Sequence, residues 1–251
     1  PTYDHPRSVA EWFGLSLDYF YLSKKFEFDI KRFKEHLLIK KPSIVYICSP
    51  NNPTGNIYSN SIVEDLLKEF PNILFMVDEA YKEFSNVTCE ALPLRYNNII
   101  ITRTFSKAFG LAAVRLGYCL SSEENINLMN KFRNPKSINL FAQIAGIASL
   151  KDMNYTNKYI NEVNKAKSLF INEINSCLLD YIKPINGYGN FVLFENLSQK
   201  SSENIVSYFE ENKIYIRNYG HIPNLKNHLR ITIGNLNQTK KAISYLKDCF
   251  I

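Results

Sequence analysis

Hydrophobic and polar positions in the first part of the chain follow two patterns in alternation. Short runs that are apolar throughout, such as Ile44–Cys48 and Ile73–Val77, are typical of strands covered on both faces. Between them, Ser61–Phe70 carries its apolar residues at helical spacing. Other strand-like runs are Leu17–Leu22, Asn98–Arg103 and Leu116–Leu120. Strands and helices in alternation predict an α/β layered domain with a largely parallel sheet.

From about Ser122 the pattern becomes mainly helical. Helices are predicted over Glu123–Phe132 and Ile138–Leu150, and a long amphipathic one from about Asn154 to Leu179 is long enough to link two domains. The shorter elements that follow are strand-like Phe191–Glu195, Ile214–Arg217 and Leu229–Ile233, and helical Glu203–Asn212 and Gln238–Cys249. We therefore predict a large domain over residues 1–153, followed over residues 154–251 by the linking helix and a small α+β domain.

Composition and charge narrow the class of protein. The 251 residues are 45% hydrophobic, which is enough for a sizeable core, but no apolar run is long enough to cross a membrane. The net charge is +6 without a long basic cluster, so we expect neither a nucleic-acid nor a membrane partner. Five widely spaced cysteines without a C-x-x-C motif indicate a reducing compartment, the cytoplasm. The four histidines lack metal-ligand spacing, so no metal site is expected.

Polar segments follow three of the predicted strands. They are Ser49-Pro50-Asn51-Asn52-Pro53-Thr54-Gly55, Asp78-Glu79-Ala80-Tyr81 and Thr104-Phe105-Ser106-Lys107, with Arg115 a little further on. Each segment alone is most often a turn or a helix cap. Ligands, however, gather at the carboxyl ends of parallel strands. An amide, a carboxylate, a phenol, a lysine and an arginine at one sheet edge predict an ion-pairing carboxylate, a nucleophilic amine and a phosphate clamp.

Taken together, these segments resemble the fold-type-I pyridoxal-phosphate-dependent aminotransferases of class I/II, most closely the histidinol-phosphate aminotransferase branch. The motifs stand in the family's order and cover essentially the whole chain. They are Asn52-Pro53-Thr54-Gly55, Asp78-Glu79-Ala80-Tyr81, Ser106-Lys107-x-x-Gly110-Leu111-x-x-x-Arg115-x-Gly117 and Leu229-Arg230-Ile231-Thr232-Ile233-Gly234. The resemblance implies a three-layer large domain with a mostly parallel sheet, a small C-terminal domain, pyridoxal 5'-phosphate as cofactor and a homodimer.

The resemblance also implies roles for the residues that would carry the chemistry. Lys107 would form the Schiff base with the cofactor and would then move the proton between substrate and cofactor. Its pKa would be lowered by burial beside a cation such as Arg115. Asp78 would keep the ring nitrogen protonated, which makes the ring a better electron sink. Tyr81 and Asn52 would hydrogen-bond the phenolic oxygen of the ring.

The remaining positions would hold the cofactor and the substrate. Thr104, Ser106 and Arg115 would bind the cofactor phosphate, and Tyr3 would cover the face of the ring. On the substrate side the candidates are Asn190, Arg217 and Arg230. Two guanidinium groups suit a phosphate better than a single carboxylate. We therefore expect a small phosphorylated amine or ketone as substrate, with glutamate and 2-oxoglutarate as the other pair.

Three further expectations stay open. A decarboxylase of a phosphorylated amino acid would use the same cofactor residues, because the bond that breaks depends on an angle the sequence does not fix. A regulatory domain that binds the cofactor without turnover is a third alternative. The family also carries a segment before Pro1 that supplies backbone amides to the cofactor phosphate and a tyrosine from the neighbouring subunit, so we expect this chain to be part of a longer protein.

Overall fold

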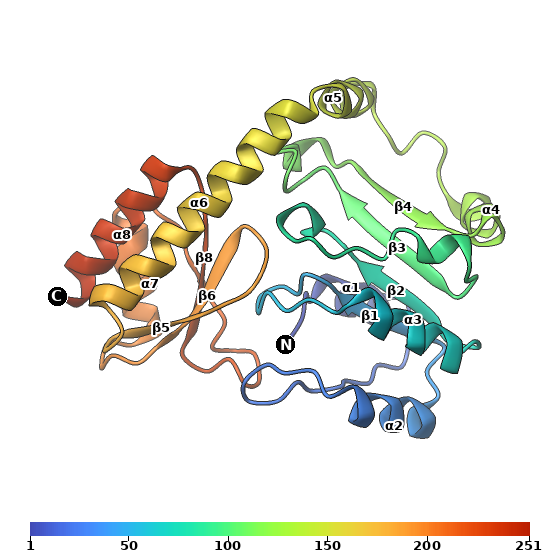
Figure 1. The fold of residues 1–251 in the computed structure, drawn as a ribbon, viewed down its shortest axis with the longest axis horizontal. Coiled ribbons are helices and arrows are strands. Elements are labelled where there is room, and N and C mark those ends of the chain that lie inside the picture. The colour runs from blue at the N-terminus through green and yellow to red at the C-terminus, as the bar shows by residue number, and fades with distance from the viewer.

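The computed structural model describes residues 1–251 and contains two four-stranded sheets (Figure 1). The first sheet has the order β1-β2-β3-β4, formed by β1 (Ile44–Cys48), β2 (Leu74–Asp78), β3 (Ile99–Thr104) and β4 (Gly117–Ser121). β1, β2 and β3 run parallel, and β4 is antiparallel to β3. Residues Cys48, Asp78 and Thr102 stand side by side in this register. The prediction of a mostly parallel sheet is therefore confirmed, and the segments that follow β1, β2 and β3 leave the sheet at one edge.

Five helices lie in the part of the chain that forms the first sheet. They are α1 (His5–Trp12), α2 (Ile30–Lys40), α3 (Asn60–Glu69), α4 (Glu123–Phe132) and α5 (Leu140–Lys151). α3 begins where the Ser59 hydroxyl accepts a hydrogen bond from the Ile62 N–H, a common helix cap. Its buried Leu66 and Leu67 belong to the same core cluster as Phe75 of β2. This core joins α3 to the strands, and it therefore helps to hold in place the carboxyl ends of the strands, from which the polar segments emerge.

One strand prediction in this region is wrong. Leu17–Leu22 forms no strand, and the side chains of Leu17, Tyr19 and Tyr21 are exposed. Phe20 packs inward, edge-on against Phe33 of α2 with 4.9 Å between the ring centroids, and Leu22 packs against the small core cluster that contains Phe26. No neighbouring strand pairs with this segment, so its apolar run does not become part of a sheet.

The second sheet is antiparallel throughout, with the order β5-β6-β8-β7. Its strands are β5 (Ile182–Ile185), β6 (Phe191–Asn196), β7 (Arg217–Asn218) and β8 (His228–Thr232), and it is accompanied by α6 (Met153–Cys177), α7 (Ser202–Glu211) and α8 (Leu236–Phe250). These elements share a core cluster that includes Phe170, Phe194 and Leu246. Tyr81 and Ala108 from the first sheet's loops belong to the same cluster, so the second sheet packs directly against the edge that carries the polar segments.

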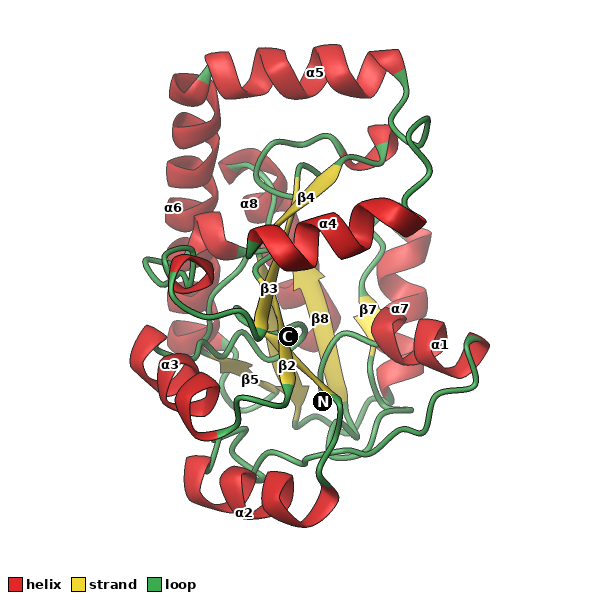
Figure 2. Cartoon of the chain, turned by 90° about the vertical axis from the view of Figure 1, so that its right-hand side faces the viewer, coloured by secondary structure: helices red, strands yellow, loops and turns green.

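The 25-residue helix α6 connects the two sheets, as the sequence pattern predicts (Figure 2). It begins beside α5 and ends next to β5 (Figure 1). Three short 3-10 helices, Lys82–Phe84, Leu92–Leu94 and Ala112–Val114, complete the secondary structure. None of the helices combines the length and the apolar character that a membrane crossing requires.

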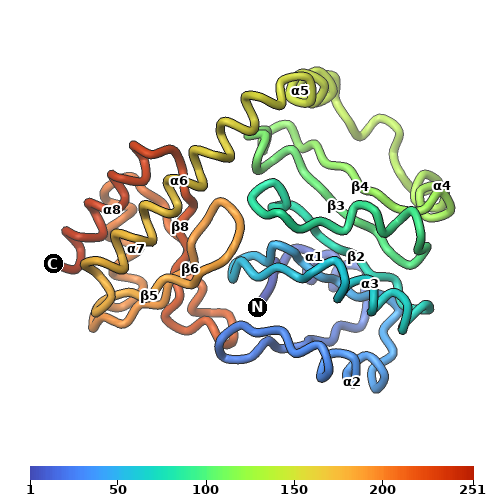
Figure 3. Tube along the Cα trace, in the orientation of Figure 1, coloured from blue at the N-terminus to red at the C-terminus, as the bar shows by residue number.

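A close approach of two loops also joins the two sheets, beside α6. The β5–β6 loop extends toward the strand ends of the first sheet (Figure 3). There the Tyr188 N–H donates a hydrogen bond of 2.8 Å to the Gly55 carbonyl. A Cβ atom on Gly55, whose φ is +75°, would lie only 2.7 Å from the Cα of Gly187. The two backbones can approach so closely because both positions lack a side chain.

Candidate active site

Asp78 ends β2 and is held by two hydrogen-bond donors. Its Oδ2 accepts from the Tyr46 hydroxyl at 2.6 Å, and its Oδ1 accepts from the Ala80 N–H at 3.0 Å. Burial raises the pKa of Asp78 above its ordinary value, whereas these two donors and the charge of Lys107 act in the opposite direction. Asp78 is thus a carboxyl group of fixed orientation at the carboxyl end of β2.

Lys107 lies in the turn that follows β3. Its Nζ is 5.3 Å from the centroid of the Tyr81 ring, and it forms no ion pair with a carboxylate. Burial lowers the pKa of Lys107 most, and Arg230 and then Arg115 lower it further, while Asp78 raises it. The cation with the larger effect is thus Arg230 from the second sheet rather than Arg115, the residue expected from the sequence. A lysine in this environment deprotonates more readily than an exposed one.

Tyr81 is buried between the two sheets. Its ring meets Phe191 of β6 edge-on at 5.1 Å between centroids. Burial raises the pKa of Tyr81 to about 12, with Arg230 as the main opposing influence. The hydroxyl therefore remains protonated at neutral pH and is available as a hydrogen-bond donor.

Arg217 and Arg230 stand directly opposite each other on β7 and β8. The Arg230 guanidinium lies 5.2 Å from the Phe191 ring centroid and donates from Nη1 to the Asn52 Oδ1 at 2.7 Å. Its Nε is buried without a hydrogen-bond partner. Neither arginine forms an ion pair within the chain. Both guanidinium groups lack an ion-pair partner, and that of Arg230 also has a buried Nε–H without an acceptor. Such groups are suited to bind an anionic ligand.

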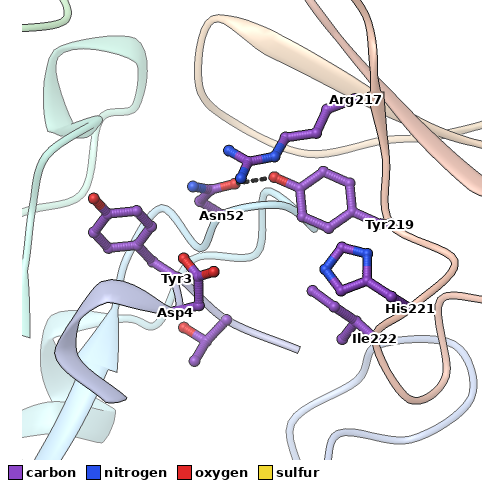
Figure 4. Close-up of a pocket in the computed structure, with 8 residues that line it drawn as sticks. Tyr3, Asp4, Asn52, Arg217, Tyr219, His221 and Ile222 are labelled. Carbon is purple, nitrogen blue, oxygen red and sulfur yellow. Dashed lines mark hydrogen bonds between the residues drawn. The ribbon is translucent and has the colours of Figure 1, made fainter. Parts of the chain in front are cut away.

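In Figure 4, Asn52 lies between Tyr3 on one side and Arg217 and Tyr219 on the other. Its Oδ1 faces the hydroxyl of Tyr219, which donates a hydrogen bond of 3.4 Å, and its amide nitrogen is on the side of Tyr3. Arg217 lies over the Tyr219 ring at 5.8 Å from the centroid. Tyr3, Asn52, Arg217 and Tyr219 line one small pocket, together with His221. The pocket thus brings together three residues predicted from distant parts of the sequence, Tyr3, Asn52 and Arg217. It also contains Tyr219, which was not predicted.

Of the predicted phosphate-side residues, Thr104 and Ser106 lie in one turn after β3, whereas Arg115 follows the 3-10 helix Ala112–Val114. The Thr104 Oγ1 accepts from the Ser106 N–H at 3.0 Å. Arg115 is exposed and in the left-handed region, with φ of 59°, and its Nη1 donates to the Ala112 carbonyl at 2.9 Å. No hydrogen bond joins the side chain of Asn190 to another of these residues, and only its carbonyl is engaged, accepting from Ile233 N–H at 2.8 Å.

The sequence analysis missed two tyrosines that bond to predicted site residues. Tyr46 contacts Asp78 from β1, and Tyr219 contacts Asn52 from the segment after β7. For Tyr46 a signal exists, because residues two apart on a strand face the same side and Cys48 pairs in register with Asp78. For Tyr219 the only signal is its position two residues after Arg217.

The comparisons with known proteins agree with this arrangement. The family model for aminotransferase class I and II matches residues 1–246, so the chain belongs to this family. The chain is 40% identical over 252 residues to a dihydroxyacetone phosphate transaminase of Campylobacter jejuni. The aligned region covers 99% of this chain and 66% of that protein. It is 34% identical over 251 residues to a histidinol-phosphate aminotransferase of Buchnera aphidicola, over 98% of this chain and 69% of that protein.

The solved structures show the same relationship in three dimensions. The histidinol-phosphate aminotransferase from Clostridium acetobutylicum superposes with a TM-score of 0.91 at 26% identity, over 99% of this chain and 75% of that one. The chain spans about two thirds of the length of the curated relatives it matches. The resemblance to the fold-type-I aminotransferases near the histidinol-phosphate branch is confirmed.

Proposed function

We propose that the protein is a pyridoxal-phosphate-dependent aminotransferase that transfers an amino group between glutamate or 2-oxoglutarate and a small phosphorylated amine or ketone. The observation that carries the proposal is the group of side chains at the strand edge. A lysine with lowered pKa, a fixed carboxyl group and two unpaired arginines lie around it. The names of the relatives add dihydroxyacetone phosphate and histidinol phosphate as the first substrates to test.

The residues present fit the cofactor. When bound, pyridoxal 5'-phosphate supplies a ring that withdraws electrons from the reacting carbon of the substrate. Asp78 offers a carboxylate for a protonated ring nitrogen, and its two donors leave it further acceptor capacity. Tyr81 and the amide of Asn52 would donate hydrogen bonds to the phenolic oxygen. Tyr3 would cover one face of the ring.

Lys107 would have two tasks in this site. Its amine would hold the cofactor and, in the reaction, would take and return a proton at the substrate carbon. Both tasks require the neutral amine, which burial and the neighbouring Arg230 favour. Arg115, Thr104 and Ser106 would bind the cofactor phosphate, and the Arg115 guanidinium keeps N–H donors free for it beside the one that bonds the Ala112 carbonyl.

The substrate would be held from the second sheet. Arg217 and Arg230, opposite each other on β7 and β8, would bind the phosphate of one substrate and the carboxylate of glutamate. Asn190, just before β6, would contribute from the substrate side. The decarboxylase alternative has weaker support, because the L-threonine-O-3-phosphate decarboxylase from Porphyromonas gingivalis is 20% identical to this chain and the likeness shows the fold alone.

The organisation of the whole protein is part of the proposal. Residues 1–153 would act as the large cofactor-binding domain and residues 154–251 as the interdomain helix and small domain. The family resemblance supports a homodimer, and the cysteine pattern supports the cytoplasm.

The visible absorption of the purified full-length protein, loaded with the cofactor, tests the function. We expect one phosphorylated amine, or glutamate, to bleach the absorption and the matching keto acid or ketone to restore it. Borohydride reduction followed by peptide mapping should place the cofactor mass on Lys107. The exposed Lys136 provides the control, since Lys136→Ala should behave as wild type and Lys107→Ala should not. Absorption that no amine changes would contradict an aminotransferase.

A further inference from the structure

Tyr46 makes the shortest hydrogen bond to a candidate catalytic group. It lies on β1 and faces the same side of the sheet as Cys48, the register partner of Asp78. The 2.6 Å separation between its hydroxyl and the Asp78 Oδ2 is in the range of an O–H donor bonded to a charged oxygen. Burial raises the pKa of Tyr46, and the nearby Cys48 and Asp78 raise it further. Tyr46 therefore remains a donor across the working pH range.

Asp78 has few groups that favour its charged form. The Ala80 N–H and the Tyr46 hydroxyl donate to it, and Lys107 is the nearby positive charge. Against them act burial and the neighbouring Glu79, both of which raise the pKa of Asp78. Tyr46 is the one side chain that donates a hydrogen bond to this carboxylate. Without it, one carboxylate oxygen would be left in a partly buried place with no donor.

We propose that Tyr46 is a positioning residue for Asp78, whose hydroxyl keeps the carboxylate both oriented and ionised for its contact with the cofactor ring. The contact between Asp78 and the cofactor ring rests on the proposed function. The effect of Tyr46 on the orientation and ionisation of Asp78 concerns only these two side chains and can be tested in the protein without cofactor.

The first experiment follows Asp78 directly. Carboxyl carbon NMR of the cofactor-free full-length protein, assigned with Asp78→Asn, gives the titration of this group. In Tyr46→Phe we expect the titration of Asp78 to move to higher pH, because a donor to the charged form is lost. Tyr58→Phe is the matched control, since Tyr58 is a neighbouring tyrosine whose hydroxyl makes no hydrogen bond in the structure. An unchanged titration in Tyr46→Phe would overturn the proposal.

The second experiment measures the consequence for the cofactor. Tyr46→Phe should bind pyridoxal phosphate about tenfold more weakly and lower kcat by about tenfold, with a smaller change in KM, because a hydrogen bond to a charged group is lost. In the Asp78→Asn background the same substitution should change kcat little, because Tyr46 would act only through Asp78. Equal losses in both backgrounds would show that Tyr46 acts by another route.

The two possible failures can be told apart. If the wild-type protein transaminates no amine, the proposed function is wrong, yet the titration of Asp78 still decides whether Tyr46 holds it ionised. If the wild type is active and Tyr46→Phe matches it in cofactor affinity and kcat, the positioning role is refuted. A melting temperature of Tyr46→Phe close to that of Tyr58→Phe excludes a general loss of structure as the cause.

Discussion

The ion pair between Arg103 and Glu79 is the most buried in the structure, and it lies next to Asp78 in the chain. The side chains are 7% and 2% exposed, and the Glu79 Oε2 accepts from the Arg103 Nε at 2.9 Å and Nη2 at 2.8 Å. The Cys89 N–H donates to the same carboxylate at 2.6 Å. Removing Arg103 leaves the Glu79 carboxylate buried without a cation, which costs about 3–5 kcal/mol, whereas Arg103 would still pair with Glu90 at 2.9 Å if Glu79 were removed. We therefore expect Arg103→Met to lower the free energy of unfolding by that amount.

Urea unfolding of the full-length protein measures the effect, and a double-mutant cycle isolates its cause. Arg103→Met combined with Glu79→Leu removes both charges, so the pair should lose less stability than the two single substitutions added together. Lys34 and Glu69 form an exposed ion pair of 2.6 Å, which makes Glu69→Gln the control, with a cost below about 1 kcal/mol. The reasoning is refuted if Arg103→Met costs no more than Glu69→Gln, or if the two single effects are additive.

Three other predictions concern the site and its surroundings. Arg217→Ala should raise KM for the phosphorylated substrate about tenfold or more with a smaller change in kcat, and an unchanged KM in steady-state kinetics would place the phosphate elsewhere. The rate at which the cofactor-free protein acquires its visible absorption should rise with pH as Lys107 loses its proton, and should level off below the pH typical of lysine. In Arg230→Gln this profile should move to higher pH, because a cation that lowers the pKa is gone, and an unmoved profile would exclude that influence. Gly55→Ala should destabilise the protein in thermal unfolding by more than Gly110→Ala, since both have positive φ but only Gly55 meets another backbone, whereas equal losses would mean that strain alone acts.

The sequence pattern predicts the first sheet well because its strands are apolar on both faces. Ile44–Cys48 is a strand with the expected bounds, and the helix Glu123–Phe132 agrees at both ends. β5 escapes prediction because it has only four residues and contains Pro184. The segment Leu17–Leu22 is misread because an apolar run indicates a strand only where a partner strand exists, and that depends on the tertiary fold.

The candidate site, like the fold, can be predicted from the sequence only in part. Lys107 and Asp78 can be proposed from the sequence because their motifs lie at the carboxyl ends of strands of the parallel sheet: Asp78 ends β2, and Lys107 lies in the turn after β3. The sequence cannot show that Arg230 influences Lys107 more than Arg115 does, because that order depends on how the second sheet packs on the first. It also cannot show that Asn52 accepts from Arg230, a residue 178 positions away.

The meeting of Gly55 with the β5–β6 loop has a consequence for how such a protein can diversify. The contact itself is between main-chain atoms, and the loop is held in addition from α6, where the Lys167 Nζ donates to the carbonyls of Gly187 and Gly189. Under the proposed function, side chains on β7 and β8 could therefore change, and with them the substrate that is bound, while this contact keeps the second sheet in place relative to Lys107. The reaction and the choice of substrate would then depend on separate parts of the chain, held together by this main-chain contact.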